Sequence, residues 1–116
     1  MMIVYGIKNC DTMKKAFTWL DNHHIAYTFQ DYRKPGLTDA ELQEILKVAG
    51  LSDIVNKRST SWRALSDSEK EAVLVPETAI AILQAHPTLV KRPLIINGDV
   101  AVIGFSEASF EKAFLS

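Results

Sequence analysis

Residues 2–32 read MIVYGIKNCDTMKKAFTWLDNHHIAYTFQDY, and this stretch decides the fold. The apolar run at 2–5 is rich in strand-forming residues and is closed by Gly6, which predicts a buried strand. Apolar residues then recur at helical spacing, so an amphipathic helix is expected over residues 11–22. Residues 27–32 alternate aromatic and polar side chains, as a second strand would. Together they form a βαβ unit, whose two strands should be parallel.

The middle of the chain is predicted to be helical. Two capping-box signatures, at residues 38–41 and 66–69, each place a Ser or Thr three residues before a Glu and start a helix. Pro76 begins a third helical pattern, which should end before Pro87 because the residue preceding proline disfavours helix. These helices form one insertion, at about residues 38–86, between the second and third strands.

The last third of the chain returns to strand periodicity. Residues 94–96 and 100–103 are predicted strands, and Asn97-Gly98-Asp99 between them is a tight-turn signal. Asn-Gly favours a primed hairpin turn, whose two central residues take positive φ. Ser106 is then expected to cap a final helix. The order β-α-β, helices, β-β-α is the thioredoxin arrangement with a helical insertion. We therefore expect one α/β domain over residues 1–116, built on a four-stranded mixed sheet.

Composition and charge limit what this chain binds. Its 116 residues carry a net charge of −1, with acidic and basic residues interspersed, which argues against nucleic acid as a partner. No apolar run approaches the ~20 residues of a membrane helix. The N-terminal segment lacks the cleavage site of a signal peptide. A lone cysteine cannot form an internal disulfide, so we expect a cytoplasmic protein, with a monomer as the default state.

The single cysteine, Cys10, lies where the first strand gives way to the first helix. Backbone N–H groups and the positive end of the helix dipole favour a thiolate at such a position, and they lower the pKa of the thiol. Lys8 and Lys14 add positive charge, whereas Asp11 opposes ionisation. The alternative interpretation is that Cys10 is a small buried hydrophobic residue, the usual fate of a free cysteine.

The residue three positions after Cys10 is Met13. A dithiol oxidoreductase carries its resolving cysteine at that position, in the pattern C-x-x-C. Because Met13 cannot resolve a disulfide, Cys10 would act as a monothiol, and an external thiol such as glutathione would clear any adduct. One cysteine and three scattered histidines show no zinc-ligand spacing, so no metal is expected.

Two basic clusters could complete a site around Cys10. Arg58 ends the cluster at 56–58, and Arg92 is followed directly by Pro93. Arginine recognises oxyanions and carboxylates because its planar fork donates two parallel hydrogen bonds. Proline before a buried strand indicates a rigid X-Pro bond that could be cis. For each arginine alone, the alternative is a solvated surface charge.

Five segments in fixed order carry a resemblance that spans essentially the whole chain. They are YGIKNCDTMKKA at 5–16, DYRK at 31–34, NKRSTSWR at 56–63, KRPLI at 91–95 and GFSEASF at 104–110. This set resembles the ArsC-like arsenate reductase family, and within it the YffB branch. The resemblance implies a thioredoxin-like fold with a helical insertion. It also implies catalysis by Cys10 and substrate binding by Arg58 and Arg92, with Lys8, Asn9 and Pro93 completing the predicted set.

The resemblance also frames the alternatives for function. Arsenate reductases of this family hold the oxyanion with three arginines, and residues 102–106, where the third is expected, contain none. The YffB branch implies a glutathione-dependent thiol reductase, with glutathione as co-substrate and no tightly bound cofactor. One alternative is a true arsenate reductase that depends on glutathione or glutaredoxin. The other is a non-catalytic regulator that binds RNA polymerase, as the related Spx proteins do, without their C-x-x-C switch.

Overall fold

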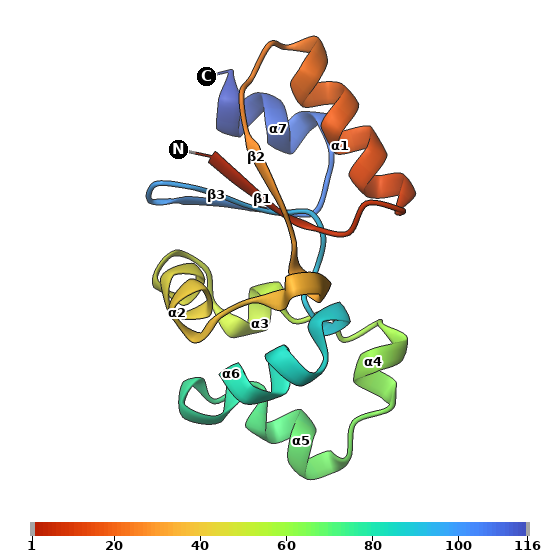
Figure 1. The fold of residues 1–116 in the computed structure, drawn as a ribbon, viewed down its shortest axis with the longest axis vertical. Coiled ribbons are helices and arrows are strands. Elements are labelled where there is room, and N and C mark those ends of the chain that lie inside the picture. The colour runs from red at the N-terminus through yellow and green to blue at the C-terminus, as the bar shows by residue number, and fades with distance from the viewer. Residues whose placement is uncertain (1, 116) are drawn as a thin grey trace. The chain divides into compact units, whose positions relative to one another are not determined.

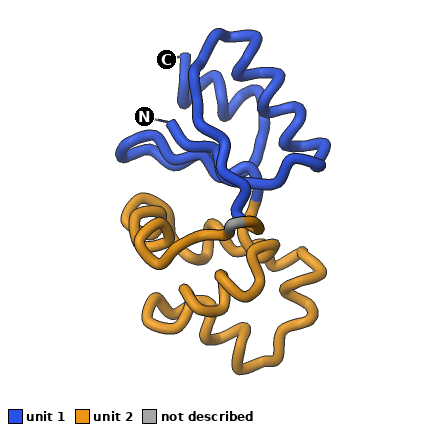
Figure 2. The backbone as a smooth tube through the Cα atoms, in the orientation of Figure 1, with its two compact units in different colours: residues 1–32, 92–116 blue, residues 33–91 orange. Residues whose placement is uncertain are grey.

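The computed structural model describes residues 2–115, without the side chain of Pro35. The chain divides into two compact units (Figure 2). Unit 1 comprises the N-terminal segment up to Tyr32 and the C-terminal segment from Arg92, and unit 2 is the intervening segment Arg33–Lys91. The helical insertion expected at about residues 38–86 falls inside unit 2. A single domain over residues 1–116 stays a prediction.

Unit 1 is built on a four-stranded sheet. Its strands are β1 (Met2–Gly6), β2 (Thr28–Asp31), β3 (Leu94–Asn97) and β4 (Val100–Ile103), in the spatial order β2-β1-β3-β4. β1 runs parallel to β2 and antiparallel to β3, and β3 runs antiparallel to β4. The predicted mixed sheet is therefore confirmed, including the parallel pair of the βαβ unit.

Two helices cover the sheet of unit 1, and both pack on one hydrophobic cluster (Figure 1). α1 (Asp11–Asn22) and α7 (Glu107–Phe114) meet where the rings of Trp19 and Phe110 lie edge to face, 5.2 Å apart. Ser106 begins α7 as expected, since its hydroxyl accepts a hydrogen bond from the backbone N–H of Ser109. Met13, in the first turn of α1, belongs to the same cluster, so this packing holds the start of the helix against the core of unit 1.

Unit 2 is helical. Its elements are α2 (Asp39–Val48), α3 (Leu51–Ile54), α4 (Thr60–Arg63), α5 (Asp67–Ala72), α6 (Pro76–Ala85) and the 3₁₀ turn η2 (Pro87–Leu89), preceded by the irregular turn η1 (Tyr32–Gly36). Both predicted capping boxes are present, with Thr38 and Ser66 as the capping residues. The short helices α3 and α4 were not predicted, because four residues are too few to show a helical period. Among the described residues, no helix is long and apolar enough to cross a membrane.

The β3–β4 hairpin differs from the prediction in its turn. Asn97 pairs with Val100, so the loop consists of Gly98 and Asp99, and Asn97 is the last residue of β3. Gly98 has a φ of 61°, and the positive φ expected at Asn97 does not occur. The turn thus lies within the predicted residues 97–99, but Asn97 ends β3 instead of entering the loop, because the register between β3 and β4 also decides which residues form the loop.

Candidate active site around Cys10

Cys10 is the residue that caps the N-terminus of α1. Its backbone is extended, with φ −137° and ψ 129°, and its carbonyl accepts the first helical hydrogen bond from the N–H of Lys14 at 3.0 Å. The side chain is half-buried and belongs to a free cysteine. It makes no capping hydrogen bond of ordinary geometry. The sulfur therefore lies at the N-terminal end of the helix, close to the free N–H groups of its first turn.

The surroundings of Cys10 favour its ionised form. Partial burial by itself raises the pKa of the thiol, but the backbone N–H of Met13, the Arg92 side chain and the backbone N–H of Thr12 outweigh it. The net result is a Cys10 pKa below its ordinary value, in the direction the sequence predicted. The cause differs in part, because the positive charge that acts here is that of Arg92, which lies far from Cys10 in sequence.

Arg92 is held in place by a tyrosine that the sequence analysis did not single out. Its Nη1 donates a hydrogen bond of 3.4 Å to the hydroxyl of Tyr32, a side chain that is 0% exposed. Burial disfavours the guanidinium charge, but the hydrogen bonds with Tyr32 and Cys10 raise the pKa of Arg92 above its ordinary value. The Nε of Arg92 is buried and has no hydrogen-bond partner among the described residues.

Pro93 anchors the segment that carries Arg92. The Arg92–Pro93 peptide bond is cis, which confirms the bond type suggested by the sequence. Pro93 is buried, and its carbonyl accepts a hydrogen bond of 2.8 Å from the N–H of Gly104, just after β4. Gly104 has a φ of 78°, a conformation that favours glycine. The turn before β3 is thus tied to the end of β4.

Met13 occupies the position of a resolving cysteine and belongs to the core. It is 0% exposed, and its thioether packs against Gly6. A Cβ atom on residue 6 would lie 2.5 Å from both Sδ and Cε of Met13. A side chain at residue 6 would therefore force the thioether of Met13 to move, a close approach that the sequence did not reveal. Residue 13 therefore stabilises the start of α1 and carries no redox chemistry.

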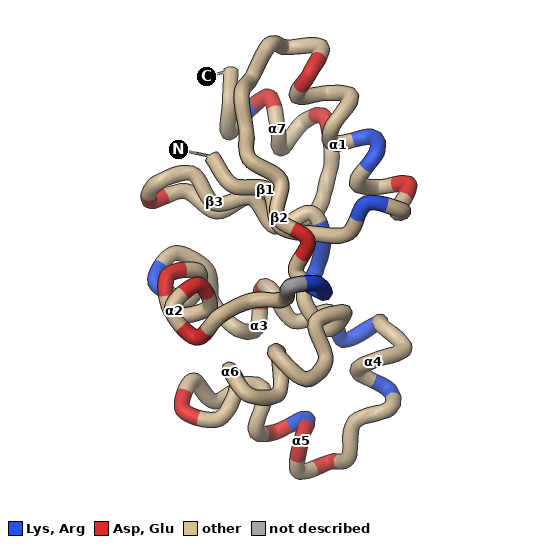
Figure 3. The backbone as a smooth tube through the Cα atoms, viewed as in Figure 1, with Lys and Arg blue, Asp and Glu red and all other residues tan. Residues whose placement is uncertain are grey.

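The other predicted site residues are distributed over both units. Lys8 and Asn9 are exposed in the connection between β1 and α1, where basic residues flank the start of the helix (Figure 3). Arg58 is exposed in unit 2, with its N–H bonded to Asn56 and its carbonyl to Arg63. The structure thus brings Arg92 and Tyr32 to Cys10 within unit 1, whereas the role of Arg58 at Cys10 stays a prediction.

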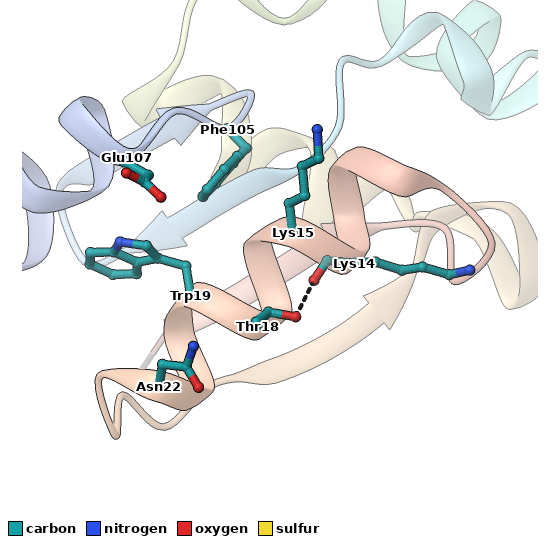
Figure 4. A pocket seen from close by; sticks show the side chains of 7 residues that line it. All are labelled: Lys14, Lys15, Thr18, Trp19, Asn22, Phe105 and Glu107. Carbon is teal, nitrogen blue, oxygen red and sulfur yellow. Dashed lines mark hydrogen bonds between the residues drawn. The ribbon is translucent and has the colours of Figure 1, made fainter.

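A hollow of about 650 Å³ runs along α1 in the same unit (Figure 4). Its lining consists of Lys14, Lys15, Thr18, Trp19 and Asn22 from α1, with Phe105 from the segment before α7 and Glu107 from its first turn. Cys10 is not part of this lining, but Lys14 lies one helical turn after it. The hollow therefore places the ammonium of Lys15 and the rings of Trp19 and Phe105 along the helix that begins at Cys10, without enclosing the sulfur.

The chain belongs to the ArsC family, whose model matches residues 5–113. An uncharacterized protein of Haemophilus influenzae is 46% identical over 114 residues, covering 98% of this chain and 99% of that protein. The global transcriptional regulator Spx of Streptococcus pneumoniae is 31% identical over 117 residues, covering 99% of this chain and 86% of Spx.

Two solved structures share both the fold and the sequence pattern. The YffB protein is 37% identical with a TM-score of 0.85, covering 97% of this chain and 98% of that one. An arsenate reductase (ArsC) related protein of Brucella melitensis is 39% identical with a TM-score of 0.74, and the match covers 97% of this chain and 93% of that one. These matches confirm the expected thioredoxin-like fold class and the predicted likeness to the YffB branch.

Proposed function

We propose that this protein is a monothiol oxidoreductase, a glutathione-dependent thiol reductase whose nucleophile is Cys10. Two features at the start of α1 support this proposal. The helix amides and Arg92 lower the pKa of Cys10, and the buried Met13 fills the position that a resolving cysteine would take. A thiolate without a resolving partner can begin thiol–disulfide exchange but needs an external thiol to complete it.

The reaction proceeds in two exchanges on a substrate thiol that is blocked by glutathione. The Cys10 thiolate attacks the glutathione sulfur, an S–S bond forms on Cys10 as the substrate's S–S bond breaks, and the substrate leaves as a thiolate that takes a proton from water. A second glutathione thiolate then attacks the glutathione sulfur on Cys10. Oxidised glutathione leaves, and the Cys10 thiolate is restored for the next cycle.

The charges near Cys10 suit glutathione, which carries two carboxylates and one ammonium group. Arg92 stands beside the sulfur, and the hollow along α1 contributes the ammonium of Lys15 with the single carboxylate of Glu107, while the Lys14 side chain extends away from them (Figure 4). We propose glutathione as the co-substrate, or glutaredoxin as an alternative source of the thiol, with no tightly bound cofactor. We further propose a monomer that works in the reducing cytoplasm, where a free cysteine persists.

Arsenate is the less favoured substrate. The resemblance to arsenate reductases implies a clamp of three arginines, and residues 94–105 supply none where the third is expected. Each missing charge-assisted hydrogen bond forgoes roughly 1.5–3 kcal/mol of oxyanion binding. We expect arsenate turnover, assayed with glutathione and glutaredoxin, to be poor. Efficient arsenate reduction would show that another cation, such as Lys8 or Lys91, completes the clamp.

The direct test of the proposed function is mass spectrometry after treatment with oxidised glutathione. The wild-type protein should gain one glutathione, on Cys10, and should lose it again when reduced glutathione is added. Cys10→Ser should gain none and should lack activity on a glutathione-blocked substrate. Failure of the wild type to form the adduct would contradict the proposal.

A second candidate function is an interaction module, favoured by the Spx relative that covers 99% of this chain. Under this proposal the chain binds RNA polymerase and Cys10 has no catalytic role. Pull-down of purified RNA polymerase with the wild type and with Cys10→Ser separates the two functions. Equal, stable capture by both, together with no reductase activity, would favour the module over the enzyme.

A further inference from the structure

Tyr32 and Arg92 lie 60 residues apart in the chain and meet beside Cys10. The tyrosine ring is completely buried, so its hydroxyl is a fixed point rather than a mobile surface group. The guanidinium uses Nη1 to donate to that hydroxyl, while its Nε is buried without a partner among the described residues. Because Nε makes no hydrogen bond among the described residues, the bond from Nη1 to Tyr32 holds the guanidinium fork.

We infer that Tyr32 is a positioning residue for the proposed reaction, because its hydroxyl orients the Arg92 guanidinium toward the sulfur of Cys10. The role in catalysis rests on the proposed function. The effect on the ionisation of Cys10 does not, because it depends only on the thiol, Arg92 and Tyr32. An arginine side chain has several rotatable bonds, and a hydrogen bond to a rigid partner selects the orientation in which the remaining donors face the thiolate.

Among the charged groups near Cys10, Arg92 is the one placed to stabilise the thiolate. On its own stretch of chain stand Lys8, Asp11 and Lys14, which are exposed and carry both signs. From the neighbouring elements come Arg92, the hydroxyl of Tyr32 and the carboxylate of Asp31, a residue that pairs in register with Gly6 at the end of β1. Exposed charges are screened by solvent, whereas a half-buried guanidinium in contact with the thiol is not. Losing the orientation of Arg92 should therefore change the ionisation of Cys10.

The test is the rate of Cys10 alkylation by iodoacetamide as a function of pH, which reports the thiolate fraction and needs no glutathione. Tyr32→Phe removes only the hydroxyl. Because 3.4 Å is long for this hydrogen bond, its loss should shift the alkylation profile toward the pH of a free thiol by about half a pKa unit, a roughly threefold lower rate below the pKa. Tyr27→Phe, which removes a half-buried hydroxyl elsewhere in unit 1, should leave the profile unchanged.

The decisive arm repeats Tyr32→Phe in an Arg92→Ala background, where it should have no further effect on the profile. An equal shift in both backgrounds would show that Tyr32 acts without Arg92, and the inference would be overturned. Arg92→Lys keeps a charge but loses the fork, and it should shift the profile in the same direction as Tyr32→Phe. An unchanged profile for either variant would also overturn it. Absence of reductase activity in a protein that shows these shifts would instead count against the proposed function alone.

Discussion

Replacing Gly6 with alanine tests how the core holds the start of α1. The new Cβ would lie 2.5 Å from Sδ and Cε of Met13, against an ordinary contact of 3.4–4 Å, so the thioether must retreat by about 1 Å. Met13 is 0% exposed, so its thioether must shift within a packed core, although the end of a methionine side chain is flexible. Overpacking a core typically costs about 1–3 kcal/mol, and the adaptable thioether places Gly6→Ala in the lower half of that range.

Chemical denaturation monitored by circular dichroism measures this change in the free energy of unfolding. Gly50→Ala is the matched control, since Gly50 has a negative φ of −76° and its added Cβ would come no closer than 3.3 Å to Asp53. The stability of Gly6→Ala should drop by clearly more than that of the control.

A double-mutant cycle with Met13 isolates the clash. Met13→Ala alone should destabilise the protein by about 2–5 kcal/mol because it leaves a cavity. Adding Gly6→Ala to that variant should then cost little or even stabilise it, because the clashing atoms are gone. Strictly additive effects of the two substitutions would refute the reasoning, since they would show that residue 6 needs glycine for some cause other than the methionine.

Three further predictions concern the site. Arg92→Ala should raise the apparent pKa of Cys10 and slow its glutathionylation by roughly tenfold, with rates compared per thiolate; an unchanged rate would remove Arg92 from the site. The pKa of Cys10 is lower in the folded state than in the unfolded chain, so its ionisation stabilises the fold above the unfolded pKa, and this contribution is lost as pH falls through the folded pKa. The stability difference between wild type and Cys10→Ser should accordingly grow as pH rises through that window in denaturation curves, and a difference that is flat with pH would contradict the lowered pKa. Reversing charge with Lys15→Glu should raise the KM for glutathione in steady-state assays while leaving the alkylation profile of Cys10 in place; a normal KM would exclude the hollow along α1 from binding it.

Local patterns in the sequence were sufficient to predict the framework of unit 1 and part of the site. The βαβ unit follows from periodicity over residues 2–32, and Cys10 follows from its place between a strand and a helix. Helix starts such as Thr38 and Ser66 were also readable, because a capping box is complete within four residues. These features depend on spacing along the chain, which the sequence displays directly.

Other features were decided only by the tertiary structure, because they depend on which distant segments pack together. Tyr32 has no local signal that marks it as the partner of Arg92, 60 residues later, and the approach of Arg92 to Cys10 results from the arrangement of β1 beside β3. The close approach at residue 6 arises from the side chain of Met13 packed upon it. Local propensity thus determines where strands and helices begin, whereas sheet register and core packing determine which side chains surround the thiol.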